Sequence, residues 1–242
     1  MENYIFGIRP VVEAIESGKI PEKVLVQQGL QGENFQQLFN IIRRLNVPYQ
    51  FVPAEKLNRL TRKNHQGVVA MVSSLEYQPL TNVLSMVYDR GETPLILLLD
   101  KITDVRNMGA IARSAECFGV HAIVLPEKGG ALVNADAIKT SAGALMRLPI
   151  CRESSLPEAI AFLQQSGIKV VAASQRANLS VLDIPADVPL AIILGSEDRG
   201  VSPACLKMAD EIRSIPMKGK TASLNVSVAA GIILSHVNNS RR

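Results

Sequence analysis

Three polar stretches beyond residue 100 hold the side chains best suited to chemistry. Their candidate residues are Asn107, Arg113, Glu197, Ser223 and Asn225. Amide, hydroxyl, carboxylate and guanidinium groups can hold a substrate through hydrogen bonds and position its reacting atoms. The three histidines of the chain all lie outside these stretches, so the usual side chain for proton transfer near neutral pH is missing from them. These residue types therefore favour chemistry that depends on binding and positioning.

The sequence contains no motif typical of a serine hydrolase, of a Rossmann-type cofactor site, or of a cysteine-based metal or disulfide site. The chain has no G-x-S-x-G turn for a hydrolase nucleophile and no G-x-G-x-x-G fingerprint for a Rossmann-type cofactor site. Its three cysteines, Cys117, Cys151 and Cys205, are odd in number and far apart, which gives no paired spacing for a metal or a disulfide. We therefore expect no metal site, and reduced thiols in a cytoplasmic protein.

Alternating strand and helix patterns over residues 95–237 must position the polar stretches. The expected strands are Leu95–Leu99, Ala122–Leu125, Lys169–Ala172, Leu190–Leu194 and Glu211–Ile215, and the expected helices are Met108–Phe118, Ala135–Ala142, Leu156–Gln165, Pro203–Met208 and Val226–Val237. This alternation predicts an α/β fold with a mainly parallel sheet that is covered on both faces. Each polar stretch follows a predicted strand, and open parallel sheets bind ligands at the carboxyl ends of their strands. The sequence thus predicts one composite pocket.

Some of these polar residues also have a purely structural explanation. Asn107 and Asn225 each precede a predicted helix, where a side-chain oxygen can cap free backbone N–H groups. Arg113 is a charged residue between the members of an apolar stripe on its predicted helix, and an ordinary surface arginine would fit this position equally well. The residues after the last helix, Asn238–Arg242, are expected to fray.

Residues 1–75 form a separate predicted α/β unit, joined by a connector at 76–94 to the domain at 95–242. A basic cluster lies between the last helix and the last strand of the small unit: Lys56, Arg59, Arg62 and Lys63. Lys56, Arg59 and Lys63 are spaced so that they could share one helical face. The cluster fits either a solvated surface or a patch that binds a nucleic-acid backbone.

The composition describes a folded protein without a membrane segment. The chain has 242 residues, of which 47% are hydrophobic, and this is ample for a packed core. No apolar run reaches the roughly 18 residues that span a bilayer, and the first residues lack the basic and apolar regions of a secretion signal. The net charge of +4 permits a polyanionic partner without requiring one.

The three stretches contain ordered motifs at residues 107–115 (NMGAIARSA), 193–200 (ILGSEDRG) and 223–230 (SLNVSVAA). Together they resemble the SpoU family of RNA ribose 2′-O-methyltransferases, within the SPOUT or α/β-knot superfamily. Asp198 stands where many members have Gly. Residues 1–75 resemble the L30e-like substrate-binding domain of the family through Phe6-Gly7 and residues 65–70 (HQGVVA).

The resemblance implies features of the fold and a cofactor that could not be inferred from the residues alone. It implies a deep trefoil knot in the C-terminal domain, a homodimer, and S-adenosylmethionine as the methyl donor, held in the knot. The residues that it places at the donor are Gly195, Ile215, Met217, Ser223 and Leu224. Glycine and a strand end can present bare backbone to an adenine edge. The two-domain form is most similar to the bacterial 23S rRNA guanosine 2′-O-methyltransferases of the RlmB type.

The implied reaction transfers a methyl group to a ribose 2′-hydroxyl of RNA. By family analogy Arg113 is the central catalytic residue, Asn107 and Glu197 shape the site, and Ser223 and Asn225 complete it. A guanidinium has a pKa above about 12 and is a poor base. We therefore expect Arg113 to clamp the target phosphate, which can polarise or accept the proton of the neighbouring hydroxyl.

Two alternatives to an rRNA enzyme stay open at this point. One is an enzyme of the same family that acts on tRNA. The other is a non-catalytic rRNA-binding protein of ribosome assembly on the same fold. The non-catalytic alternative predicts loss of the motif residues, but Asn107, Arg113, Glu197 and Asn225 are all present.

Overall fold

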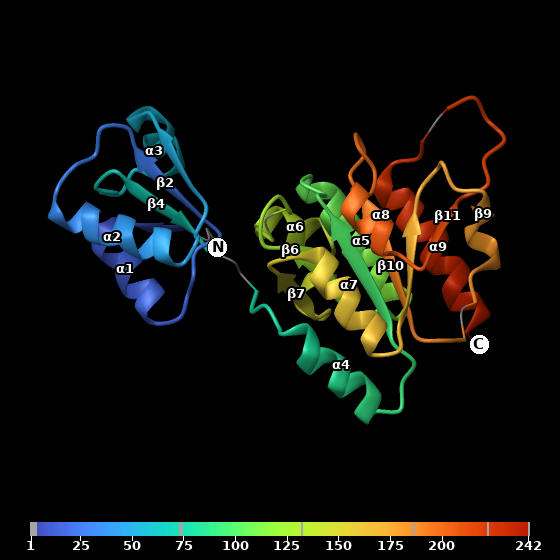
Figure 1. Ribbon diagram of the computed structural model, residues 1–242. Helices are drawn as coiled ribbons and strands as arrows, with labels where there is room; N and C mark the ends of the chain where they lie inside the picture. The colour runs from blue at the N-terminus through green and yellow to red at the C-terminus, as the bar shows by residue number, and fades with distance from the viewer. Residues whose placement is uncertain (1–3, 73–74, 132, 186, 222, 242) are drawn as a thin grey trace. The chain divides into compact units, whose positions relative to one another are not determined.

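The computed structural model describes residues 4–72, 75–131, 133–185, 187–221 and 223–241. The chain separates into two compact units, Met1–Ser74 and Leu75–Arg242 (Figure 1). Each unit has its own sheet and its own buried core. Within the described residues, no helix is long and apolar enough to cross a membrane.

The N-terminal unit is a four-stranded sheet with helices on both faces. Its elements are β1 (Tyr4–Phe6), α1 (Ile8–Glu16), β2 (Lys23–Gln27), α2 (Glu33–Arg44), β3 (Tyr49–Val52), α3 (Ala54–Leu60) and β4 (Val68–Met71). The strands lie in the order β1-β4-β2-β3, and only the β2–β3 pair is parallel. Successive residues of a strand point to opposite faces. Accordingly, Val24 and Val26 pack with α1 and α2, whereas Leu25 packs with Leu57 of α3.

The C-terminal unit is built on a seven-stranded parallel sheet. Its strands are β5 (Leu95–Asp100), β6 (Ala122–Pro126), β7 (Ile150–Glu153), β8 (Lys169–Ala173), β9 (Leu179–Ser180), β10 (Leu190–Gly195) and β11 (Glu211–Ser214), in the order β7-β6-β5-β10-β8-β11-β9. Every strand pair is parallel, which confirms the predicted mainly parallel sheet. The sequence did not predict β7, whose second half is Arg152-Glu153, or the two-residue β9.

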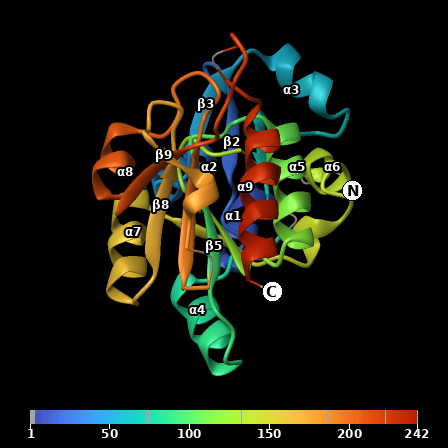
Figure 2. The ribbon, with the colours of Figure 1, turned by 90° about the vertical axis from the view of Figure 1, so that its right-hand side faces the viewer.

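Helices cover both faces of this sheet (Figure 2). They are α4 (Leu80–Asp89), α5 (Val105–Cys117), α6 (Ala135–Thr140), α7 (Leu156–Gln165), α8 (Pro203–Met208) and α9 (Val226–Ser240), with 3-10 turns η1 (Ala144–Met146) and η2 (Val181–Asp183). Helices α5, α6 and α9 pack on one face, which includes Leu97 and Leu99 of β5. Helices α4, α7 and α8 pack on the other face, which includes Ile96 and Leu98. Because both faces are covered, every residue of β5 is buried.

Residues expected to form a connector at 76–94 instead pack with the C-terminal unit. Four apolar side chains of α4, namely Leu80, Val83, Leu84 and Val87, are buried in the core beneath α7 and α8. Their spacing places them on one face of the helix, which the sheet covers. The separation between the units falls before this helix, at Ser74 and Leu75.

The chain is fixed rather than frayed as far as Arg241, which corrects the prediction for the described part of Asn238–Arg242. Helix α9 continues to Ser240, and the guanidinium of Arg241 donates to three backbone carbonyls. These belong to Thr93, Pro94 and Val188, at 2.9, 3.0 and 2.9 Å. Burial lowers the pKa of Arg241. Arg242 lies outside the described residues.

Candidate functional site

The carboxyl ends of two neighbouring strands bring the first two motifs together. Strands β5 and β10 pair in register, with Asp100 opposite Gly195. The chain leaves β5 into α5, and it leaves β10 into the loop at residues 196–202. The third motif follows β11 and begins α9, which packs on α5 in the same core. The predicted composite arrangement of the three stretches is therefore present.

One amide or carboxylate side chain from each motif joins a single hydrogen-bonded cluster. Glu197 Oε1 accepts from Asn107 Nδ2 at 2.6 Å and from Asn225 Nδ2 at 2.7 Å. Asn225 Nδ2 also donates to Asn107 Oδ1 at 3.1 Å. A carboxylate that accepts two such bonds fixes the orientation of both amides. We call Asn107, Glu197 and Asn225 the polar cluster.

The way in which α5 and α9 begin explains why the amides of Asn107 and Asn225 face the Glu197 carboxylate. Asn107 was predicted to cap α5, and this is wrong: the helix starts earlier, and Asp104 caps it by accepting from the backbone N–H groups of Arg106 and Asn107. The Asn107 side chain is therefore free to bind Glu197. The predicted cap at Asn225 is confirmed, since its Oδ1 accepts from Ser227 N at 2.9 Å. Its NH2 group still points to the cluster.

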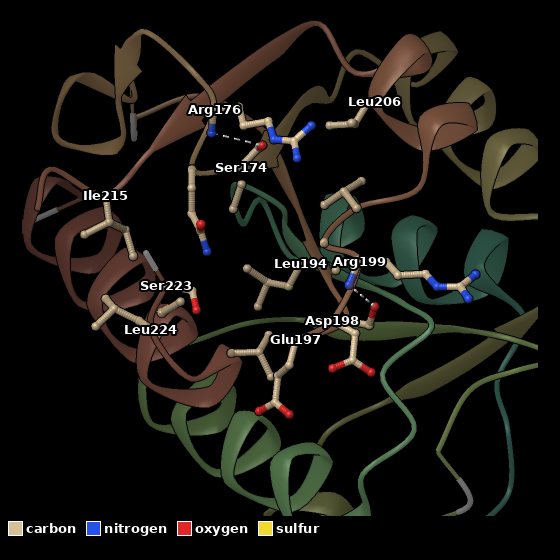
Figure 3. A pocket seen from close by; sticks show the side chains of 18 of the residues that line it. Ser174, Arg176, Leu194, Glu197, Asp198, Arg199, Leu206, Ile215, Ser223 and Leu224 are labelled. Carbon is tan, nitrogen blue, oxygen red and sulfur yellow. Dashed lines mark hydrogen bonds between the residues drawn. The ribbon is translucent and has the colours of Figure 1, made fainter. Parts of the chain in front are cut away.

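A pocket of about 330 Å³ lies beside the cluster (Figure 3). Its lining includes all five residues expected at the donor, namely Gly195, Ile215, Met217, Ser223 and Leu224. Figure 3 shows Ile215, Ser223 and Leu224 along one side of the cavity, with Leu194 at its centre. Glu197 belongs to both the lining and the polar cluster. The pocket and the cluster are thus parts of one site.

One wall of this pocket was not predicted from the sequence. Ser174, Gln175 and Arg176 line it, and they follow the end of β8. This strand was predicted, as Lys169–Ala172, and β8 lies next to β10 in the sheet. Applying the rule that ligands bind beyond the carboxyl ends of parallel strands to every predicted strand would have identified these residues.

The loop after β10 closes tightly over Gly195. A Cβ atom at this position would lie 2.0 Å from both Gly200 C and Val201 N, so no larger residue fits without moving backbone. Gly200 N donates to Ser196 O at 2.7 Å, and Ser202 N donates to Asp100 Oδ2 at 2.7 Å. These bonds hold the loop, and with it Glu197, against the end of the sheet.

Arg113 is not part of the polar cluster. Its side chain is exposed on α5, and it does not line the pocket. Six residues of an α-helix turn through about 600°, so Arg113 lies about a third of a turn around the axis from Asn107. The structure thus gathers four of the five predicted catalytic residues (Asn107, Glu197, Ser223 and Asn225) around one site and leaves Arg113 apart.

The basic cluster of the N-terminal unit is exposed but does not share a helical face. Helix α3 ends at Leu60, and Thr61 has extended backbone angles. Lys56 and Arg59 therefore lie on the helix, whereas Arg62 and Lys63 lie beyond it, which corrects the predicted spacing. Lys63 Nζ lies 5.8 Å from the centroid of the Phe6 ring. All four basic side chains are exposed.

The described residues contain no group of three or more His, Cys, Asp or Glu side chains that could hold a metal ion. Cys117 is exposed, and Cys151 and Cys205 are buried. Burial raises the pKa of the Cys151 thiol to about 12. This group therefore stays protonated at neutral pH.

Two protein-family descriptions match the chain. RNA 2′-O ribose methyltransferase substrate binding matches residues 4–78, and the SpoU rRNA Methylase family matches residues 94–235. Together with the site at the strand ends, these matches define a methyltransferase that acts on the ribose 2′-hydroxyl of RNA. The chain belongs to the SpoU rRNA Methylase family.

Relatives of known name support this family. A protein of Bacillus subtilis (strain 168) named as a TrmH family tRNA/rRNA methyltransferase, YacO, is 30% identical over 99% of this chain and 96% of its own length. The SpoU methyltransferase AviRb from Streptomyces viridochromogenes, solved with AdoMet, is 25% identical and has a TM-score of 0.63. The match covers 98% of this chain and 90% of AviRb. A solved RNA 2′-O ribose methyltransferase is 26% identical over 98% of this chain and 88% of its own, with a TM-score of 0.57.

These matches confirm the expected α/β fold with a small N-terminal domain, and they confirm an S-adenosylmethionine-dependent enzyme. The knotted path of the chain stays a prediction. The pocket suits this donor chemically, because the apolar side chains of Leu194, Ile215 and Leu224 can cover an adenine ring. The Glu197 carboxylate lies where it can attract a sulfonium or an ammonium group.

Proposed function

We propose that this enzyme methylates the 2′-hydroxyl of a guanosine in 23S rRNA. The observation that supports it is the polar cluster beside a pocket lined by every residue expected at the donor. The two-unit organisation favours rRNA over tRNA. The match to a TrmH/SpoU tRNA modifying enzyme from A. aeolicus covers 66% of this chain, which is too little to include both units in full, and residues 4–78 match a substrate-binding family of their own.

In this proposal Gly195, Ile215, Met217, Ser223 and Leu224 hold S-adenosylmethionine. When bound, the donor supplies an electrophilic methyl group. The pocket residues keep the donor fixed beside Glu197, because the loop at residues 196–202 is bonded to the end of β5. Holding two reactants in a fixed geometry contributes several kcal/mol, on the order of 7–11 at best, toward lowering a barrier.

The polar cluster still has capacity to bind RNA. Asn225 uses both hydrogens of its amide within the cluster, whereas Asn107 uses one of its two. Among the described residues, the second Asn107 N–H and Glu197 Oε2 have no hydrogen-bond partner. An amide donor and a carboxylate acceptor side by side match the oxygen and the hydroxyl group of a ribose. We assign Asn107 and Glu197 to orienting the target ribose.

We further propose that the site is completed in a homodimer. Arg113 is exposed on α5 about a third of a turn from Asn107, and Val228 and Ile232 of α9 are exposed apolar residues, 50% and 38% accessible. A second copy that covers this apolar surface would bring its Arg113 near the first copy's site. There the guanidinium would clamp the phosphate next to the target hydroxyl.

Mixing two inactive variants tests the shared site. Arg113→Ala and Glu197→Ala should each lower activity by about 10-fold or more, and a mixture that has exchanged subunits should be more active than either variant alone, because some dimers then contain one intact site. An Arg113→Lys enzyme that folds, binds RNA and keeps near-normal turnover would contradict the bidentate clamp. A monomeric mass in active solution would contradict the dimer.

The RNA target is tested by mapping ribose methylation across rRNA and tRNA in a strain that lacks this gene. We expect the loss of one 2′-O-methylguanosine from 23S rRNA, and its return when the intact gene is supplied. The Arg113→Ala gene is the matched control and should not restore it. Loss of a methyl group from tRNA alone would replace the rRNA assignment with the tRNA alternative.

A further inference from the structure

A cluster of aromatic rings on the N-terminal unit has no part in the site described above. It consists of Phe35 and Phe39 on α2 and of Tyr49 and Phe51 on β3. The Phe39 ring lies 5.5 Å from Phe35, 5.1 Å from Tyr49 and 6.1 Å from Phe51, measured between centroids. Tyr49 and Phe51 meet edge to face at 5.8 Å. The four rings form one continuous surface, which we call the aromatic surface.

This surface is open to solvent. Tyr49 and Phe51 are 42% and 45% accessible, although aromatic side chains of this size are usually covered. They are two residues apart on β3, so they point to the same face of the sheet. Strand β3 is also at the edge of its sheet. Neither the core nor a neighbouring strand therefore explains why two rings are presented here.

A cationic group extends the aromatic surface. Phe35, Phe39 and Arg43 follow one another at four-residue intervals along α2, which places them in one row. The Arg43 guanidinium lies 5.8 Å from the centroid of the Phe39 ring, and Arg44 is exposed in the same last turn. The acidic residue of this helix, Glu33, is at its opposite end. The surface therefore combines flat rings with positive charge.

We propose that the aromatic surface binds unpaired bases of the RNA substrate by stacking. This inference rests on the proposed action on RNA. Unstacked bases of single-stranded segments bind on aromatic rings and on arginine guanidinium planes, while the positive charge holds the backbone. A protein partner would gain from the apolar rings, but Arg43 and Arg44 add a preference for a polyanion. The N-terminal unit then uses Lys56 and Arg59 for phosphates and the aromatic surface for bases.

A single new tryptophan can report base stacking directly. The chain contains no tryptophan, so the full-length Tyr49→Trp enzyme has one emitting indole and keeps a ring at this position. Titration with a short single-stranded oligoadenylate should quench its fluorescence, and a blunt RNA duplex of the same length should not. Quenching by both RNAs to the same extent, or by neither, would overturn base stacking.

Removing the two exposed rings tests their contribution to RNA affinity independently of the fluorescence experiment. Tyr49→Ala combined with Phe51→Ala should weaken binding of the same oligoadenylate by about 5- to 150-fold, since stacking contributes about 1–3 kcal/mol per base. Ile20→Ala is the matched control, because Ile20 is an apolar residue of the same unit that is even more exposed, at 54%, and lies outside the aromatic surface. It should leave the affinity unchanged.

Four further outcomes separate the possible failures. Unchanged affinity in the double variant would overturn the proposal. A double variant that sediments as a smaller species would also overturn it, because the rings would then form a contact between copies. Methyl transfer to RNA without fluorescence quenching would reject the stacking surface and leave the enzyme activity intact. Quenching without methyl transfer to any RNA would reject the proposed function instead.

Discussion

The two units of this enzyme present their functional side chains in opposite ways. In the C-terminal unit, Asn107, Glu197 and Asn225 come from distant parts of the sequence and are bonded to one another. In the N-terminal unit, the basic cluster and the aromatic surface come from residues 35–63 and are largely exposed. A group that acts on a reacting atom needs a fixed geometry, whereas phosphate and base contacts tolerate mobile side chains. We therefore expect substitutions to separate chemistry from RNA affinity.

The largest effect is expected at the floor of the donor pocket. Gly195→Ala should weaken S-adenosylmethionine binding by about 5- to 150-fold or more, because a Cβ atom would lie 2.0 Å from the backbone of Gly200 and Val201 and overpacking costs about 1–3 kcal/mol. Calorimetry would measure this. Gly219→Ala is the control, since nothing lies within 4 Å of a Cβ atom at Gly219. Equal donor affinity in both variants would contradict the assignment of the pocket.

The next largest effect is expected in the polar cluster. Glu197→Ala should lower kcat/KM by about 10- to 150-fold, since hydrogen bonds to a charged group contribute about 1.5–3 kcal/mol. Affinity for single-stranded RNA should stay close to that of the unchanged enzyme. Asp198→Ala is the matched comparison and should lower kcat/KM less, because Asp198 also lines the pocket but makes no hydrogen bond or ion pair within the described part of the chain. A parallel loss of RNA affinity in Glu197→Ala would remove the contrast between the units.

A smaller effect is expected in the basic cluster. Replacing Lys56, Arg59 and Lys63 together with Ala should weaken RNA binding across sequences, and each lost phosphate contact should reduce the salt dependence by about 0.7–0.9 units of slope. Donor affinity and turnover at saturating RNA should not change. Filter binding at several salt concentrations would test this. An unchanged affinity and slope would identify the cluster as a solvated surface.

The smallest effect is expected at an ion pair between strands β8 and β11. Glu211 binds Lys169 and Arg213, and the hydrogen bond from Lys169 is the main cause of its lowered pKa. A lowered carboxyl pKa stabilises the folded state above the unfolded pKa, and this contribution is lost as the pH falls through the folded value. Glu211→Gln should cost about 1 kcal/mol or less near pH 7, and the difference should shrink toward pH 3. Denaturant unfolding at both pH values would measure it, and a constant difference would contradict the ion pair.

The sheet and the position of the site could be predicted because their signals are local. The central strands are continuous apolar runs, and polar residues follow each one. The donor residues came from the family resemblance, and in the structure they all lie at or after the ends of strands β10 and β11. The rule that ligands bind beyond the carboxyl ends of parallel strands also applies to Ser174–Arg176, but these residues follow β8, a shorter strand that begins with a lysine.

Local sequence patterns did not predict the hydrogen-bond partners of side chains or the residues at which helices begin and end. Asp104 and Asn107 are both good caps, and the sequence alone does not decide which of them starts α5. The end of α3 at Leu60 removed Lys63 from the expected helical face. Arg241 is fixed by carbonyl groups 53 to 148 positions away, which no local pattern reveals.

The polar cluster also has a consequence for how the enzyme acquires its activity. Asn107 and Glu197 are 90 positions apart in sequence, and Asn107 and Asn225 are 118 apart. Contacts between such distant residues form slowly, because long loops must close before the contact stabilises anything. On dilution from denaturant, the far-ultraviolet signal of the helices should therefore recover before donor binding does. A chain halted at that stage would already have its helices, yet it could not bind S-adenosylmethionine.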